Sequence, residues 1–105
     1  MLVRGLTIIL ESDAPQRARL AYEMALVQRA MGSEATLFIT GGAVTTLATP
    51  STARDESHDG GVRLIVCQTA LAEARLSLTT LDPRIEAGGL VSLMQGLGDD
   101  RLVVI

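Results

Sequence analysis

The run Leu6-Thr7-Ile8-Ile9-Leu10 is short, rich in β-branched residues and free of polar alternation. This pattern is typical of a strand that is covered on both faces, as in a parallel sheet. Ala35–Ile39 and Val62–Val66 are runs of the same kind, and a segment with helical spacing separates the first run from the second. Strands that alternate with helices over short links predict an α/β fold with an open, doubly wound parallel sheet and right-handed crossovers. We expect about five strands flanked by helices in three layers, with the first run as a central strand.

The segment from Ala14 to Met31 predicts the helix of the first unit. Pro15 falls in the first turn, where a missing N–H costs little, and Gly32 follows the last turn as a terminator. Four larger apolar residues recur at helical spacing, and alanines that permit close packing lie alongside them: Leu20, Met24, Val27 and Met31, with Ala18, Ala21 and Ala25.

Beyond the second strand the pattern weakens. Gly41-Gly42 ends that strand, and Ala43 to Ala48 has room for one or two helical turns. From Thr49 to Gly61 the composition changes to Pro, Ser, Thr, Asp, His and Gly without any period, which predicts a mobile loop.

The part of the chain after Cys67 predicts short helices and a closing strand. Ala70, Leu71, Ala74 and Leu78 indicate a short amphipathic helix. Asp82-Pro83 can open another helix, which Gly88-Gly89 cuts short before a brief extended segment. The last segments are a helix over Leu90 to Gly98 and a strand over Arg101–Ile105, which can be buried only if the other strands surround it.

Length, charge and composition exclude several classes of protein. A chain of 105 residues is expected to form a single domain, here residues 1–105. Tyr22 and Phe38 are the only aromatic residues, and the nine basic residues are scattered arginines in a chain of net charge −3. Stacking on bases and binding to phosphate backbones are therefore disfavoured, so no nucleic-acid partner is expected. The chain has neither a long apolar run nor a secretory signal, so we expect no membrane partner and a cytoplasmic location.

Cys67, the only cysteine, is the candidate catalytic residue. It follows the third strand and opens a helix, at the sheet edge where α/β proteins bind ligands. Backbone N–H groups and the helix dipole at such a position favour a thiolate and predict an accessible, acidic thiol. Cysteine is also among the most frequently buried residue types, so a packed, inert thiol is an equal alternative.

His58 is the only histidine and would be the natural proton acceptor for a cysteine. Its place in the predicted loop favours a solvated side chain that titrates freely.

The remaining polar clusters suggest no cofactor and no metal. Gly41-Gly42 lacks the other residues of a phosphate-binding loop, and Asp99-Asp100 is expected to keep a turn hydrated. One acidic group has a spacing that fits neither a calcium loop nor a zinc signature: Asp55, Glu56, His58 and Asp59.

The order of segments resembles the DsrE/DsrF-like family, which includes the TusD-type subunits of sulfur relay. In that family a helix rich in Ala and Leu precedes a "G-x-x-x-x-L-F" strand, and a strand after a "G-V" step delivers a cysteine. Gly32 to Phe38 and Gly61-Val62 to Cys67 stand in those places here, and the stretch from Leu81 to the closing Asp99 to Ile105 also follows the family pattern.

The resemblance implies that Cys67 accepts sulfane sulfur as a persulfide and passes it on, as a sulfurtransferase or sulfur carrier. It also implies sulfur-donor and sulfur-acceptor proteins as partners and a trimeric or hexameric homo-oligomer. The segment from Gly41 to Gly61 departs from the family because it lacks a clear central helix. Two alternatives therefore stay open: a binding or regulatory module that uses a pocket near Gly41 and Cys67 without covalent chemistry, and a structural subunit in which Cys67 is core.

Overall fold

The computed structural model describes residues 3–105 and confirms the predicted architecture of a five-stranded parallel sheet flanked by helices. The elements, in chain order, are β1 (Leu6–Leu10), α1 (Pro15–Ala30), β2 (Ala35–Ile39), the 3-10 helix η1 (Gly41–Ala48), α2 (Thr52–Asp59), β3 (Arg63–Cys67), α3 (Gln68–Glu73), the 3-10 helix η2 (Leu78–Thr80), β4 (Glu86–Gly88), α4 (Leu90–Gln95) and β5 (Arg101–Val104).

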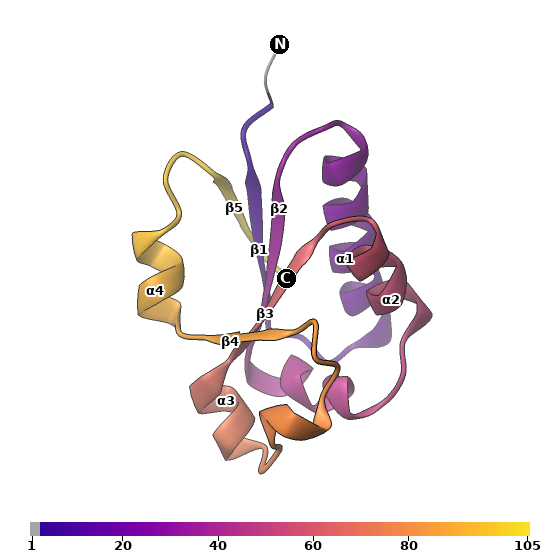
Figure 1. Cartoon of the computed structure of the whole chain (residues 1–105), viewed down its shortest axis with the longest axis vertical. Helices are drawn as coiled ribbons and strands as arrows, with labels where there is room; N and C mark the ends of the chain where they lie inside the picture. Colours follow the sequence, from indigo (N-terminus) through magenta and orange to yellow (C-terminus); the bar gives the residue numbers. More distant parts are fainter. Residues whose placement is uncertain (1–2) are drawn as a thin grey trace.

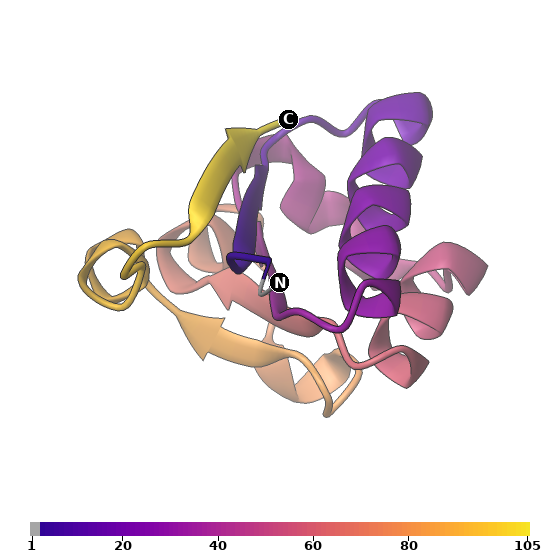
Figure 2. The same cartoon turned by 90° about the horizontal axis from the view of Figure 1, so that it is seen from above.

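The strands are ordered β4-β3-β2-β1-β5, so the chain crosses the sheet in one direction as far as β4 and then returns to pair β5 with β1. Because crossovers between parallel strands are right-handed, this reversal moves the last helix to the opposite face of the sheet. Accordingly, α1 and α2 lie on one side of the sheet, and α4 lies on the other (Figures 1 and 2).

The larger core lies on the side of the sheet that α1 covers. Alternate residues of the three interior strands point into it and are almost fully buried, and each such side chain contributes roughly 1.5–3 kcal/mol through removal from water. On the other face, Phe38 and Ile65 are buried outside this core. The strand residues of the larger core are Leu6, Ile8 and Leu10 of β1, Ala35, Leu37 and Ile39 of β2, and Leu64 and Val66 of β3.

The buried face of α1 differs from the expected one. Leu20, Val27 and Met31 are 49%, 58% and 53% exposed, whereas Ala21 and Ala25 are fully buried. The small side chains let the helix backbone approach the sheet, which leaves the larger apolar residues at the flank and in solvent.

One polar side chain fixes the buried face of α1. Gln28 is 1% exposed, and its amide donates hydrogen bonds to the carbonyls of Arg4 (2.7 Å) and Glu34 (3.2 Å). Because those backbone acceptors satisfy the amide, burial of this polar group carries little cost.

The predicted mobile loop from Thr49 to Gly61 is wrong, because its centre is the helix α2. The Ser51 hydroxyl caps this helix by accepting a hydrogen bond from the Arg54 N–H at 3.1 Å. The Arg54 side chain is 5% exposed, and its guanidinium donates to the carbonyls of Thr49 (2.7 Å) and Thr46 (3.4 Å). A guanidinium bonded to backbone carbonyls thus holds α2 in place, a role that a stripe of apolar side chains has in other helices. Because this anchor is a single charged residue, the sequence shows no hydrophobic periodicity there.

Two features near the end of the chain also differ from expectation. The last strand, β5, lies at an edge of the sheet, and Leu102 and Val104 are 43% and 60% exposed. Asp82-Pro83 forms a turn instead of a helix, because the Asp82 carboxylate accepts the Arg84 N–H at 2.9 Å. The brief extended segment expected after this turn is β4.

Candidate functional site

Cys67 is the last residue of β3 and the residue that precedes α3. Its side chain is partly buried and packs against the larger core, so the thiol is neither fully exposed nor sealed. The residue opposite Cys67 in β4 is Gly88. Residues that face each other across neighbouring strands project to the same side of a sheet, so β4 places no side chain directly opposite Cys67, and the Ile65 methyl group lies where a Gly88 side chain would be.

The helix that follows Cys67 is shorter than the sequence suggests. It ends at Glu73 after six residues, and the Cys67 side chain makes no capping hydrogen bond to it. Leu78, which was expected on this helix, belongs to η2 and is 38% exposed. The position of Cys67 at the end of β3 is therefore its main structural feature.

Gly41 and Cys67 lie at the same edge of the sheet, since each is found where a parallel strand ends. Gly41 begins η1, which contacts both β3 and α3. A hollow of about 450 Å³ opens at this edge, but it lies over the ends of β1 and β5 and its lining includes Asp13, Gly42 and Val104. Cys67 does not line this hollow. The hollow is therefore not the expected pocket shared by Gly41 and Cys67.

His58 lies in the last turn of α2 and not in a loop. Its Nε2 atom is buried and makes no hydrogen bond within residues 3–105. Burial, followed by the nearby positive charge of Arg84, lowers the pKa of His58 below its usual 6.5.

The fold does not assemble a cysteine–histidine pair. Ser57, the neighbour of His58, accepts the Val62 N–H just before β3 begins, whereas Cys67 is the last residue of that strand. At about 3.3 Å per residue, the length of β3 separates the two regions by roughly 13 Å.

The acidic residues around His58 are held by an arginine that sequence spacing could not identify. Arg84 binds the carboxylates of Asp55 (3.2 Å), Asp59 (3.2 Å) and Asp82 (2.8 Å). Its hydrogen bonds hold the pKa of Asp82 well below the usual range. Within residues 3–105 no three His, Cys, Asp or Glu side chains are grouped in a way that could hold a metal ion.

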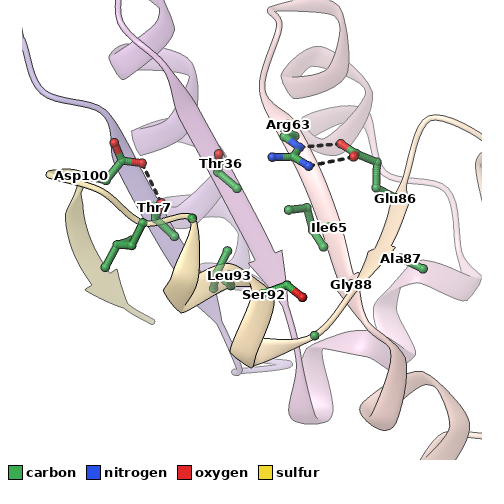
Figure 3. A pocket seen from close by; sticks show the side chains of 13 residues that line it. Thr7, Thr36, Arg63, Ile65, Glu86, Ala87, Gly88, Ser92, Leu93 and Asp100 are labelled. Atoms are coloured by element: carbon green, nitrogen blue, oxygen red, sulfur yellow. Dashed lines mark hydrogen bonds and ion pairs between the residues drawn. The ribbon is translucent and has the colours of Figure 1, made fainter.

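A second group of polar residues, which the sequence did not single out, lines a crevice of about 220 Å³ beneath α4 (Figure 3). Thr7, Thr36 and Arg63 are register partners across β1, β2 and β3 and form its floor. At one end the Thr7 hydroxyl donates to Asp100 at 3.0 Å, and at the other Arg63 binds Glu86 through two hydrogen bonds of 2.7 and 3.0 Å. Asp100 is thus half-buried and bonded, not part of a hydrated turn.

The ion pair at one end of this crevice shifts the titration of both partners. Its hydrogen bonds raise the pKa of Arg63 and lower the pKa of Glu86. The two side chains are 60% and 49% exposed, so the pair is a surface salt bridge that contributes little to folding.

No helix within residues 3–105 has the length and apolar character needed to cross a membrane.

Comparisons with known proteins agree with this architecture. Solved structures that are similar over nearly the whole chain include MTH1491 from Methanobacterium thermoautotrophicum (14% identity, TM-score 0.81, 98% of this chain and 100% of that one), BT1422 from Bacteroides thetaiotaomicron (16%, 0.80, 96% and 94%) and the ychN protein from E. coli (18%, 0.78, 99% and 100%). The first two are described as proteins of unknown function. At these identities the likeness establishes the fold alone.

No protein of curated function matches the sequence. The sequence model of the DsrE/DsrF-like family, however, matches residues 5–104, which is almost the entire chain. This protein therefore belongs to the DsrE/DsrF-like family.

Proposed function

We propose that this protein is a sulfur-relay protein that accepts sulfane sulfur as a persulfide on Cys67 and passes it on. The observation that carries the proposal is the position of the only thiol of a DsrE/DsrF-like chain, which is partly exposed at a strand end and faces Gly88 in the next strand. A partly exposed position suits a group that has to meet the thiols of two other molecules in turn.

The chemistry needs one thiol on this chain. The Cys67 thiolate attacks the outer sulfur of a donor persulfide, a new S–S bond forms at Sγ, and the donor's own S–S bond breaks with its electron pair leaving on the donor thiolate. Transfer to an acceptor thiolate repeats the same exchange with Cys67 as the leaving group. Neither step consumes an oxidant or reductant, and neither needs a second cysteine on this chain.

The proposal includes the partners and the location of the protein. The donor and the acceptor are proteins that carry thiols, and a carrier thiol has to stay reduced between transfers, which suits the cytoplasm.

The proposal also includes a homo-oligomer of three or six copies, as the family resemblance implies. Apolar side chains supporting such contacts are exposed on α4 and on the edge strand β5: Leu90, Val91, Met94, Leu102 and Val104. Sedimentation at working concentration should give a mass well above the 11.1 kDa of one chain, and a lone 11.1 kDa species would contradict this part of the proposal.

The relay itself is tested by mass spectrometry after incubation with polysulfide or with a cysteine desulfurase and its substrate. The wild-type protein should gain one sulfur atom, and the Cys67→Ser variant should gain none. A cyanide treatment that removes sulfane sulfur should return the wild-type mass. If the wild type stays unmodified while a known carrier in the same mixture is labelled, the relay proposal is wrong.

Alkylation separates this proposal from a purely structural thiol. Cys67 should react with iodoacetamide in the folded protein, and urea should accelerate the reaction only modestly because the thiol is already partly exposed. A thiol that reacts only after unfolding would favour the structural alternative.

A further inference from the structure

The crevice beneath α4 carries an unbalanced charge. Arg63 is neutralised by Glu86 through two hydrogen bonds, so the positive and negative ends of that pair cancel. Asp100 is half-buried, and its one side-chain partner is the neutral hydroxyl of Thr7. Within residues 3–105 no arginine or histidine lies within ion-pair distance of Asp100. The Asp100 carboxylate is therefore free to accept charge-assisted hydrogen bonds from a bound cationic group.

The floor of the crevice also holds unused hydrogen-bonding groups. Thr36 lies in the centre of the row between Thr7 and Arg63, and its hydroxyl has no hydrogen-bond partner among residues 3–105 (Figure 3). Arg63 uses Nε and Nη2 on Glu86, and its Nη1 has no side-chain partner in the described part of the chain, from residue 3 onward. Across the crevice, the Asp100 carboxylate, the Thr36 hydroxyl and the Arg63 Nη1 atom therefore follow one another. The carboxylate can accept a further hydrogen bond, the guanidinium nitrogen can donate one, and the hydroxyl can do either.

Glycines keep the crevice open on the side of β4 and α4. Gly88, Gly89 and Gly96 line it, and a methyl group at Gly89 would meet nothing within 4 Å. The volume of about 220 Å³ lies below the roughly 300–1,000 Å³ of pockets for drug-sized ligands. A ligand of only a few heavy atoms fits such a space.

From this arrangement we propose that the crevice binds a small zwitterion of the amino-acid type. Its ammonium group pairs with Asp100, its carboxylate reaches Nη1 of Arg63, and the Thr36 hydroxyl contacts it between the two charges. The ammonium group supplies most of the affinity because Asp100 is the charge that lacks a partner. This site goes beyond the proposed relay function and does not depend on Cys67.

The test is an NMR titration of the ¹⁵N-labelled full chain with three matched probes. β-Alanine carries both charged groups, ethylamine lacks the carboxylate, and propionate lacks the ammonium. β-Alanine should bind most tightly and ethylamine more weakly, and both should shift the amide signals of Thr7, Thr36 and Asp100 to saturation. Propionate should leave these signals unchanged at the highest concentration that keeps pH and ionic strength constant.

Adjacent aspartates provide a matched pair of variants. Asp100→Asn keeps an acceptor for the Thr7 hydroxyl but removes the charge, and it should weaken β-alanine and ethylamine by about tenfold or more. Asp99→Asn removes an exposed charge next to it and should change neither affinity. Arg63→Met should weaken β-alanine and leave ethylamine unaffected.

A further variant keeps the test decisive if Asp100→Asn proves unstable. Thr36→Val preserves the shape of the side chain and removes the hydroxyl, so it should weaken β-alanine several-fold in a protein with a wild-type circular dichroism spectrum. The proposal is overturned if β-alanine and ethylamine fail to shift the crevice amides. It is equally overturned if propionate binds as well as β-alanine.

Discussion

Replacement of Gly5 by alanine should destabilise the protein through a single side chain, that of Asp100. A Cβ atom at Gly5 would lie 2.1 Å from Asp100 Oδ1, whereas real Cβ contacts essentially never fall below 3.0 Å. The carboxylate must therefore move by about 1 Å, and we expect this movement to break the 3.0 Å hydrogen bond that its other oxygen, Oδ2, accepts from the Thr7 hydroxyl. Thr7 is 3% exposed, so its hydroxyl would be left buried without that partner.

The magnitude follows from the lost interaction. A hydrogen bond to a charged group contributes about 1.5–3 kcal/mol, and an alanine in place of glycine returns about 0.4–1 kcal/mol by restricting the unfolded chain. Gly5→Ala should thus lower the free energy of unfolding by about 0.5–2.6 kcal/mol, and each kcal/mol corresponds to roughly 4 °C in Tm for a domain of this size. Asp100→Ala should cost about 1.5–3 kcal/mol because it removes the same bond.

The assay is a double-mutant cycle measured by urea unfolding. In the Asp100→Ala background the clash is gone, so Gly5→Ala should change sign and stabilise the protein by about 0.4–1 kcal/mol. Gly42→Ala is the control: its added methyl group would meet its neighbours at an ordinary 3.8 Å, so this variant should not destabilise the protein and should gain about 0.4–1 kcal/mol from the restricted unfolded chain. Equal costs of Gly5→Ala in both backgrounds would refute the reasoning.

Three further variants test other parts of the structure. Arg75 has a left-handed backbone (φ 57°), so Arg75→Gly should raise the free energy of unfolding by up to about 1 kcal/mol in urea titrations, and a loss would contradict this. Val27→Glu should change the free energy of unfolding by less than about 0.5 kcal/mol because the side chain is exposed, whereas Ala25→Leu should cost about 1–3 kcal/mol by overpacking. A larger cost for Val27→Glu than for Ala25→Leu would mean that α1 buries the face predicted from the sequence. The pKa of His58 is lowered in the folded protein, so on acidification the unfolded chain binds a proton at this residue first, and the free energy of unfolding should fall as the pH drops below 6.5. The urea midpoints of the wild type and of His58→Gln should therefore diverge below this pH. Midpoints that change with pH in the same way in both proteins would contradict the assigned environment.

The sheet could be predicted from the sequence because its signals are local. Leu6–Leu10 and Ala35–Ile39 are recognised without reference to other segments, and the glycine that follows the first helix marks its end. The family pattern was readable for the same reason, since it consists of these runs and of the step that leads to Cys67.

The parts that were mispredicted depend on contacts between distant residues. α2 is held in place by the Arg54 guanidinium, which donates hydrogen bonds to carbonyls of the preceding segment. Such an anchor produces no periodic pattern in the sequence. The burial of Gln28 has no signal in the sequence because its acceptors are backbone atoms of other segments. The crevice row combines Thr7, Thr36 and Arg63, and only the parallel register brings these separate positions together.

The anchoring of Arg54 has a consequence for motion. Its guanidinium bonds to the carbonyls of Thr46 and Thr49, so a side chain of α2 closes the end of η1. The guanidinium links the two helices while it stays in place, and its departure removes a donor from each of these carbonyls. The span from Gly41 to Asp59 should therefore exchange its amide hydrogens as one cooperative unit, although its composition suggests a string of independent turns.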